Sequence, residues 1–297
     1  MITLKSPEDI KTYRQSAGKL SKEVLRMVGT MIKPGISTLE LDKAAESFIR
    51  ERGGESGFKG FEGFPSTLCT SVNDQLVHGI PSPKVILNEG DIISIDTGAD
   101  ADGWAGDNAW TFQVGEVSDE VKALCECARD CLAAGIQQAS PGNTLGDIGH
   151  AIQSLAKENG YGVVRDYVGH GIGHDMHEDP NVLNYGKPGR GVCLQAGMLL
   201  AIEPMLTLGS ARVHMLSNGW TVVTDDEKPC AHFENVVAVT EDGPVILSAD
   251  EKGPWCPMVG GPDAEIEVPA SFRENEEGTE VSEEENSSSE AESTDQQ

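Results

Sequence analysis

Apolar residues recur at helical spacing in four stretches of the chain. Residues 6–31 open with Ser-Pro-Glu-Asp, which is a helix-start signal, and apolar positions such as Ile10 and Leu20 follow at that spacing, so one long helix is predicted before Pro34. The same spacing predicts three further helices, at residues 37–52, 116–139 and 143–159. Asn143 is the expected cap of the last one. Short apolar runs bounded by turn residues predict strands within residues 68–81, 92–96, 108–114, 194–203 and 231–239.

Part of this pattern occurs twice. The sequence LNEGDIISID, residues 87–96, aligns at an offset of 107 with LQAGMLLAIE, residues 194–203, so that Asp96 corresponds to Glu203. The predicted helices upstream repeat at nearly the same offset, each after a Pro-Gly turn and a Thr-Leu pair. One long period that occurs twice predicts two half-domains related by a pseudo-two-fold axis. A site where the halves meet would receive an acid from each.

Several of these strands carry acids that need a partner. Asp96 ends a buried strand, and a hairpin predicts that Asp107 faces it, where two carboxylates repel unless a cation lies between them. Glu234 stands inside the apolar strand AHFENVVAV. His170 lies in the glycine-rich stretch YVGHGIGHDMHEDP. Together with Glu203 these residues form an oxygen-rich set that suits two divalent ions such as Mn, Fe(II), Co or Zn, some carboxylates bridging, and that predicts hydrolysis by an activated water.

Other polar and aromatic residues are less distinctive on their own. A lone histidine at a strand end, such as His78, is more often structural than catalytic, and we interpret His214 and His232 as structural or surface residues. The loop GFKGFEGFP, residues 57–65, is expected to pack its three rings on the core. Cys125, Cys127 and Cys131 lie in a predicted helix, where ordinary packing is favoured over a structural zinc site.

Composition limits the possible partners and compartment. The chain has 297 residues, of which 38% are hydrophobic, enough for a sizeable core. Its formal net charge of −27 argues against attraction to nucleic acid or to an anionic membrane. The polar start, the absence of a long apolar run and the odd, scattered cysteines predict a cytosolic protein. Residues 262–297 hold 13 acids against one base, so we expect a folded domain at 1–250 and a disordered acidic tail at 251–297.

The ordered set of acids and histidine resembles a known family. The strings HGIP and HGIG and the Ile-Glu-Pro after the second repeat strand are similar to those of type I methionine aminopeptidase, over roughly residues 3–248. The resemblance implies the pita-bread fold, an α+β architecture with an antiparallel central sheet and outer helices. It implies that His170 and Glu203 bind one ion and Asp96 the other, while Asp107 and Glu234 bridge. Glu203 would also be the general base, and His78 and His177 would contact the scissile amide and stabilise the tetrahedral intermediate.

The resemblance also gives the aromatic loop a role. The residues that it places around the methionine side chain are Phe58, Phe61, Phe64, Cys69, Met176 and Trp220. Because His174 and Asp175 depart from the family pattern, contacts to the second substrate residue are open. The compact length indicates the bacterial short form. The resemblance implies a monomer that acts on nascent peptide N-termini, at the ribosome, when the second residue is small. A non-catalytic peptide binder and a prolidase-like dipeptidase are the alternatives; the complete ligand set disfavours the first and the missing N-terminal domain the second.

Overall fold

A computed structural model describes residues 1–249 of the chain. The predictions made for the acidic tail, including its disorder, lie outside the described residues. Within the described part, the helices are α1 (Pro7–Gln15), α2 (Ala17–Met31), α3 (Thr38–Glu51), α4 (Asp119–Gln137) and α5 (Leu145–Glu158). A short 3-10 helix, η1, spans Phe61–Gly63.

The helix ends follow the expected capping chemistry, with two corrections. The predicted helix at 6–31 is two helices, because Ser16 leaves the helical conformation (φ −110°, ψ −100°) while its hydroxyl donates to the Thr12 carbonyl. The N-cap of α5 is Thr144 and not Asn143, since the Asp147 carboxylate accepts hydrogen bonds from the Thr144 N–H and hydroxyl. Asn143 instead donates its side-chain amide to the Gln138 carbonyl and closes the turn before the helix.

Every strand pair in the described part of the chain is antiparallel. The strands are β1 (Glu55–Ser56), β2 (Leu68–Val72), β3 (Gln75–Val77), β4 (Ile92–Asp100), β5 (Asp107–Gln113), β6 (Gly162–Val163), β7 (Gly169–Gly171), β8 (Glu178–Val182), β9 (Leu199–Ile202), β10 (Met205–Thr207), β11 (Val213–Met215), β12 (Val222–Thr224), β13 (Cys230–His232), β14 (Glu234–Thr240) and β15 (Gly243–Ile246). The large sheet runs in the order β1-β4-β5-β14-β9-β7-β8, with β2 on β4 and β15 on β14. Two smaller sheets are β13-β10-β6 and β11-β12-β3.

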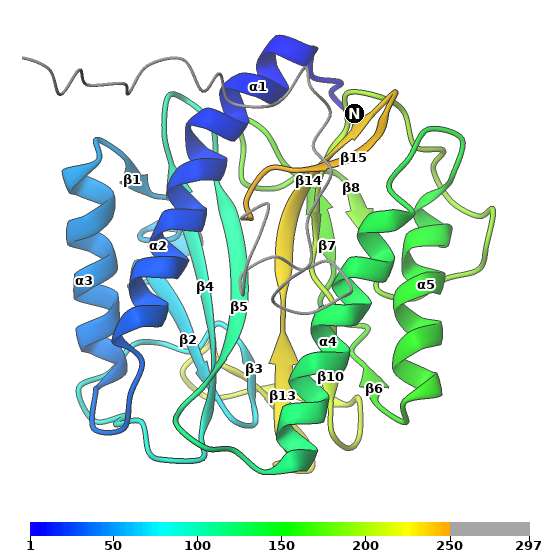
Figure 1. Cartoon of the computed structure of the whole chain (residues 1–297). Coiled ribbons are helices and arrows are strands. Elements are labelled where there is room, and N and C mark those ends of the chain that lie inside the picture. The colour runs from blue at the N-terminus through cyan, green and yellow to red at the C-terminus, as the bar shows by residue number, and fades with distance from the viewer. Residues whose placement is uncertain (250–297) are drawn as a thin grey trace, which may run out of the picture.

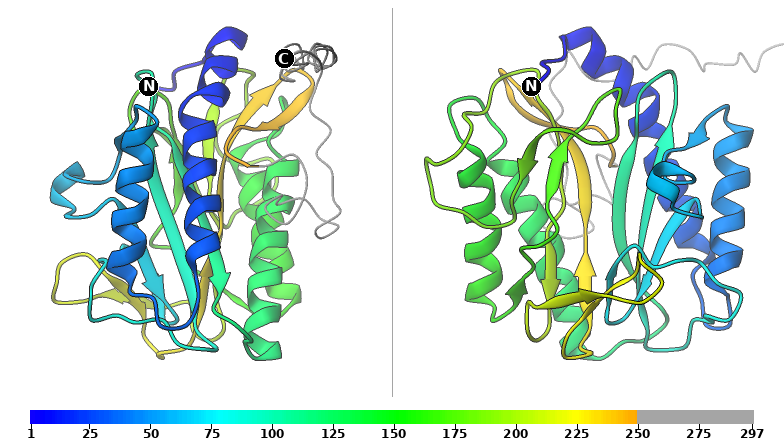
Figure 2. Two further views of the ribbon diagram at one scale, coloured as in Figure 1. Left: turned by 60° about the vertical axis from the view of Figure 1, so that its left-hand side comes forward. Right: turned by 180° about the vertical axis from the view of Figure 1, so that it is seen from behind.

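The elements form two principal layers. Helices α2 and α3 lie over one half of the large sheet and α4 and α5 over the other, all on the same face (Figure 1). Seen from behind, the opposite face of the sheet comes forward and the short strands of the smaller sheets lie at its lower end (Figure 2). Side chains of the first face pack under the helices in a core that includes Leu41, Ile95, Leu132 and Ile152. The opposite face of the sheet is not covered by these helices, so its side chains are available to form a site.

The predicted pseudo-two-fold relation is visible in local detail. The two helices of the repeat, α3 and α5, each begin with a capping box. The capping residue of each also forms an isolated antiparallel bridge, Ser37 with Ile86 in one half and Thr144 with Cys193 in the other. Each partner of the second bridge is 107 residues beyond its counterpart, the offset read from the sequence. The halves join where β5 pairs with β14. Strands that begin or end at this seam therefore bring residues of both halves together.

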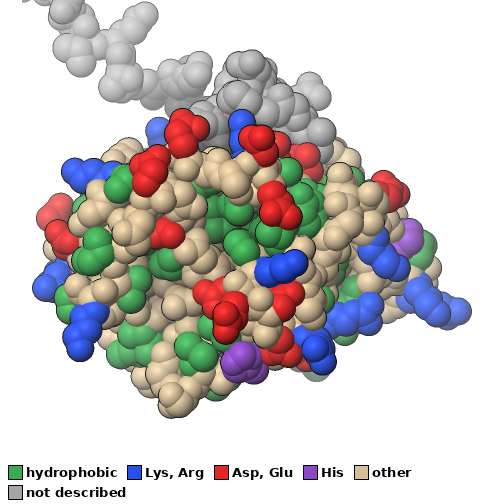
Figure 3. Space-filling model, turned by 90° about the horizontal axis from the view of Figure 1, so that it is seen from below, with side chains coloured by type: hydrophobic (Ala, Val, Ile, Leu, Met, Phe, Trp, Pro, Cys, Tyr) green, Lys and Arg blue, Asp and Glu red, His purple; other side chains and the backbone are tan. Residues whose placement is uncertain are grey.

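The prediction about packing of the three helical cysteines is also tested. Cys125, Cys127 and Cys131 are all buried in α4, as ordinary helix packing predicts. Acidic and basic side chains are interspersed on the face seen from below (Figure 3). None of the helices among residues 1–249 is long and apolar enough to cross a membrane.

Candidate metal centre and substrate pocket

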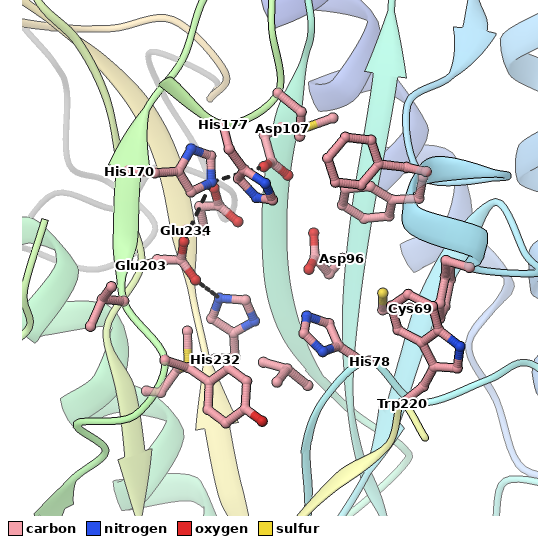
Figure 4. A pocket seen from close by; sticks show the side chains of 18 of the residues that line it. Cys69, His78, Asp96, Asp107, His170, His177, Glu203, Trp220, His232 and Glu234 are labelled. Atoms are coloured by element: carbon pink, nitrogen blue, oxygen red, sulfur yellow. Dashed lines mark ion pairs between the residues drawn. The ribbon is translucent and has the colours of Figure 1, made fainter. Parts of the chain in front are cut away.

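A pocket of about 320 Å³ opens on the face of the sheet opposite the helices (Figure 4). Its walls combine acids, histidines and apolar side chains from both halves of the chain (Figure 4). It is lined by all thirteen site residues proposed from the sequence: Phe58, Phe61, Phe64, Cys69, His78, Asp96, Asp107, His170, Met176, His177, Glu203, Trp220 and Glu234. The fold thus gathers residues that are up to 176 positions apart in the sequence, from Phe58 to Glu234.

Strand register places the four acids on one face of the sheet. Ala109 of β5 is paired with Asp96 on one side and with Glu234 on the other, and Asp107 is paired with Gly98. Because side chains alternate along a strand, residues two positions apart share a face, so these three acids point the same way. Asp96 and Asp107 are diagonal neighbours, however, and not directly opposed as the hairpin alone suggested. Glu203 reaches the same space from the end of β9.

Burial makes this group of acids costly without a cation. Asp107, Glu203 and Glu234 are each less than a tenth exposed. One carboxylate oxygen of Asp96, one of Asp107 and one of Glu234 are buried without a hydrogen-bond partner. Burial, with the charges of Asp107 and Glu203, raises the pKa of both Asp96 and Glu234 well above the ordinary carboxyl value.

His170 is held so that one ring nitrogen faces the acids. Its Nδ1 lies 2.9 Å from the Gly171 carbonyl, which fixes Nδ1 as the donor and turns Nε2 inward. Nε2 is 3.5 Å from Asp107 Oδ2 and 3.7 Å from Glu203 Oε1. Burial opposes protonation, but the hydrogen bond to Asp107 and the charges of Glu203 and Asp107 outweigh it and raise the pKa of His170 to about 9. In the absence of a metal, the His170 imidazole is therefore protonated, because the neighbouring carboxylates favour a positive charge at this place.

These donors fit the divalent ions that the sequence predicts. One atom each of Asp107, His170 and Glu234 lie within 4.8 Å of one another, and so do one atom each of Glu203, His232 and Glu234. The unpartnered carboxylate oxygens are the hard donors that such ions prefer, and the raised pKa values show that positive charge is missing from the protein itself. Glu234 belongs to both groups, as expected of a bridging ligand.

His232 is the functional candidate that sequence reasoning missed. The sequence favours a structural or surface role for it, but His232 is 2% exposed, lines the pocket, and places Nε2 at 3.4 Å from Glu203 Oε2. The available signal was its position two residues before Glu234, since residues i and i+2 of an extended segment share a face. His214 is exposed and pairs with Asp225, so the surface interpretation was right there.

Two further histidines border the acids. His177 meets the His170 ring edge-on, with centroids 4.4 Å apart. His78 takes a left-handed backbone conformation, φ +58°, after β3 and packs its ring against Tyr167 and Trp220. Burial lowers the pKa of both, that of His78 to about 4, so each is neutral near pH 7 and has one N–H to donate.

The aromatic loop lines the apolar end of the pocket. Phe64 packs edge-on against Trp220 at 5.1 Å, and Phe61 packs against His177 at 5.4 Å. Met176 and Cys69 add sulfur atoms to the same wall. A Cβ added at Gly98 would lie 2.6 Å from the Phe58 ring, so glycine is needed there for the ring to lie against β4. The rings therefore form part of a binding pocket as well as packing on the body.

His174 and Asp175 do not line this pocket. The His174 ring instead stacks on Trp104 at 4.0 Å, and its Nδ1 lies 2.7 Å from the Gly103 carbonyl. The departure from the family pattern at His174 is thus accommodated by contacts on the outside of the β4–β5 turn.

The pseudo-symmetric antiparallel sheet, with acids from both halves meeting at its seam, defines the class of pita-bread metallopeptidases. The sequence matches metallopeptidase family M24 over residues 13–241. It is 50% identical over 251 residues to a methionine aminopeptidase of Clostridium acetobutylicum, covering 84% of this chain and 100% of that protein. It is 49% identical over 248 residues to methionine aminopeptidase 1 of Bacillus subtilis, covering 84% and 99%.

Solved structures agree. The crystal structure of methionine aminopeptidase from Rickettsia prowazekii superposes with a TM-score of 0.82 at 40% identity, covering 84% of this chain and 100% of that one. Prolidase from Pyrococcus furiosus superposes with a TM-score of 0.66 at 23% identity, covering 84% and 66%, and shares the fold. The chain belongs to metallopeptidase family M24 and, within it, to the methionine aminopeptidases.

Proposed function

We propose that this protein removes the initiator methionine from nascent chains as a dinuclear metallo-aminopeptidase. The observation that carries the proposal is the meeting of two features in one pocket: a buried group of acids and histidines, and beside it an apolar wall of aromatic rings and sulfur atoms. The first is suited to hydrolysis of an amide, and the second to an unbranched thioether side chain.

The assignment of the ligands to two ions rests on the similarity to methionine aminopeptidases. His170 and Glu203 would hold one ion, Asp96 the other, and Asp107 and Glu234 both. Ions of Mn, Fe(II), Co or Zn bound there supply the positive charge that polarises the amide carbonyl and acidifies a water molecule. The orphaned oxygens of Asp96, Asp107 and Glu234 support this assignment.

The remaining steps fall to side chains. Glu203 would take a proton from the water that attacks the carbonyl carbon and pass it to the amide nitrogen, so that the C–N bond breaks and methionine and a shortened peptide leave. Neutral His177 and His78 would donate hydrogen bonds to the amide and to the negative charge that develops on the carbonyl oxygen. Their lowered pKa values support a role as donors that carry no charge of their own.

Specificity would come from both ends of the pocket. The residues that would surround the methionine side chain are Phe58, Phe61, Phe64, Cys69, Met176 and Trp220. Phe61 also packs against His177, so its ring would narrow the space beside the scissile bond and favour a small second residue. We infer that the protein acts in the cytoplasm, as a monomer, on peptide N-termini as they leave the ribosome.

The test is release of methionine from Met-Ala-Ser, compared with Leu-Ala-Ser and Met-Leu-Ser, after the metal-free protein has been reloaded with each of the four metals in turn. We expect cleavage of Met-Ala-Ser alone, and loss of cleavage in Glu203→Gln. No release with any metal would overturn the proposal and favour a peptide-binding protein that has kept its ligands.

A further inference from the structure

His232 is positioned more rigidly than a side chain that only fills the pocket wall. Its backbone N–H donates to Thr111 Oγ1 at 2.9 Å, and the same hydroxyl donates to the His232 carbonyl at 2.8 Å. Ser94 Oγ lies 2.8 Å from Thr111 Oγ1 and completes this buried set. The backbone of His232 is thereby clamped to β5, the strand that carries Asp107.

The chain around His232 also determines where its ring points. Phe233, the next residue, turns to the other side and packs against Trp110 with centroids 4.8 Å apart. His232 and Glu234 therefore share the pocket face, and Figure 4 shows the ring beneath Glu203, with His170 on the other side of that carboxylate. Glu203 has an imidazole near each of its oxygens: His170 Nε2 at 3.7 Å from Oε1 and His232 Nε2 at 3.4 Å from Oε2.

The contact with Glu203 is not a hydrogen bond. His232 Nε2 is buried and has no hydrogen-bond partner, and 3.4 Å exceeds the usual N–H···O range of about 2.7–3.2 Å. A separation of 3.4 Å does suit two ligands of one ion, because donors about 2.1 Å from a tetrahedral centre lie roughly 3.4 Å apart. One oxygen of Glu234 completes a group of three donors within 4.8 Å of one another.

We propose that His232 is a further metal ligand of this centre, which binds an ion through Nε2 together with Glu203 and Glu234. The centre then has imidazole ligands on both sides of Glu203, and five ligands read from the sequence become six. The inference rests on the proposed metal centre but not on the peptide that it cleaves.

The test is made on the full-length protein, freed of metal and titrated with Co(II) without oxygen. Imidazoles bound to Co(II) give ring-proton resonances shifted far outside the normal NMR range, so the spectrum counts histidine ligands directly. We expect shifted resonances from His170 and from His232 in the wild type, and from His170 alone in His232→Gln. Calorimetry should show that His232→Gln weakens at least one Co(II) site by about tenfold or more, since even outer-shell partners contribute about 10–100-fold.

Two other variants separate ligation from structural effects. His150→Gln removes an exposed histidine of α5 and should leave both the spectrum and the affinity unchanged. His232→Phe retains a ring but has no nitrogen atom to bind a metal. It should therefore lack the shifted His232 resonances, and it provides the test if His232→Gln fails to fold.

Two results would overturn the proposal. The shifted imidazole resonances could be the same in wild type and both His232 variants with unchanged affinity. Alternatively, affinity could fall while every imidazole resonance is kept, which would make His232 a residue that only orients Glu203. If the wild type loads with Co(II) and shows both histidines but does not cleave Met-Ala-Ser, the proposed function fails while this inference stands.

Discussion

Replacing Glu234 by glutamine should stabilise the metal-free protein and weaken its binding of metal. One Glu234 oxygen lies within 4.8 Å of a Glu203 oxygen, and one lies within 4.8 Å of an Asp107 oxygen. Two unit charges 4.8 Å apart repel by about 3.5 kcal/mol at an effective dielectric constant of about 20. A proton shared among the acids and the charge on His170 offset part of this, so we expect Glu234→Gln to raise the free energy of unfolding of the metal-free protein by about 1–3 kcal/mol at pH 8.

The sign of the pH dependence follows from the raised pKa of Glu234. A carboxyl whose folded pKa lies above its unfolded value favours folding below the unfolded pKa, and this contribution is lost as the pH rises through the folded pKa. The advantage of Glu234→Gln should therefore be largest at pH 8 and smaller at pH 5. Added Mn(II) should reduce this advantage, because a tenfold loss of affinity removes about 1.4 kcal/mol of ligand stabilisation.

Urea denaturation of both proteins, with and without Mn(II), at pH 5 and pH 8 measures these differences. Glu241→Gln is the matched control, because it removes the same charge from an exposed position between β14 and β15. A metal-free Glu234→Gln protein that is less stable than wild type at pH 8, or a Mn(II) stabilisation equal in the two proteins, would refute the electrostatic reasoning.

Three further variants test other parts of the site. Glu203→Gln should lower kcat for Met-Ala-Ser by about 10²–10⁴-fold, the usual effect of a lost general base, while methionine still binds with wild-type affinity; an effect confined to KM would contradict that role. Gly98→Ala places a methyl 2.6 Å from the Phe58 ring and 2.9 Å from Met176 Cε, so KM should rise by about tenfold or more with little change in Co(II) affinity. The pKa of His78, about 4, lies below its ordinary value of 6.5, so the wild type should lose up to about 1.4 kcal/mol of stability per unit as the pH falls between them. Urea midpoints at pH 7 and pH 5 should show that His78→Gln loses less stability than the wild type between these pH values. An equal loss in the two proteins would exclude His78 as the source of the pH dependence.

Most of the fold was present in the one-dimensional pattern. Apolar spacing identified the helices, and the repeat at 107 residues identified the two halves, which the paired bridges of Ser37 and Thr144 confirm. What spacing did not show was the interruption at Ser16, where a hydroxyl bond to the previous turn competes with the helix. A single serine within an apolar helical pattern does not show whether its hydroxyl will bond to the backbone of the previous turn and interrupt the helix.

The sequence alone determined which chemical groups are out of place in an apolar strand, since the cost of burying a carboxylate is a property of the residue and its neighbours along the chain. That was sufficient to select Asp96, Asp107, Glu203 and Glu234. Only the tertiary structure decided their mutual distances, the diagonal placement of Asp96 and Asp107, and the entry of His232 into the same space. Register between strands and the direction of a ring depend on contacts between segments far apart in the sequence, and a histidine is common enough at structural positions that its type alone does not reveal a ligand.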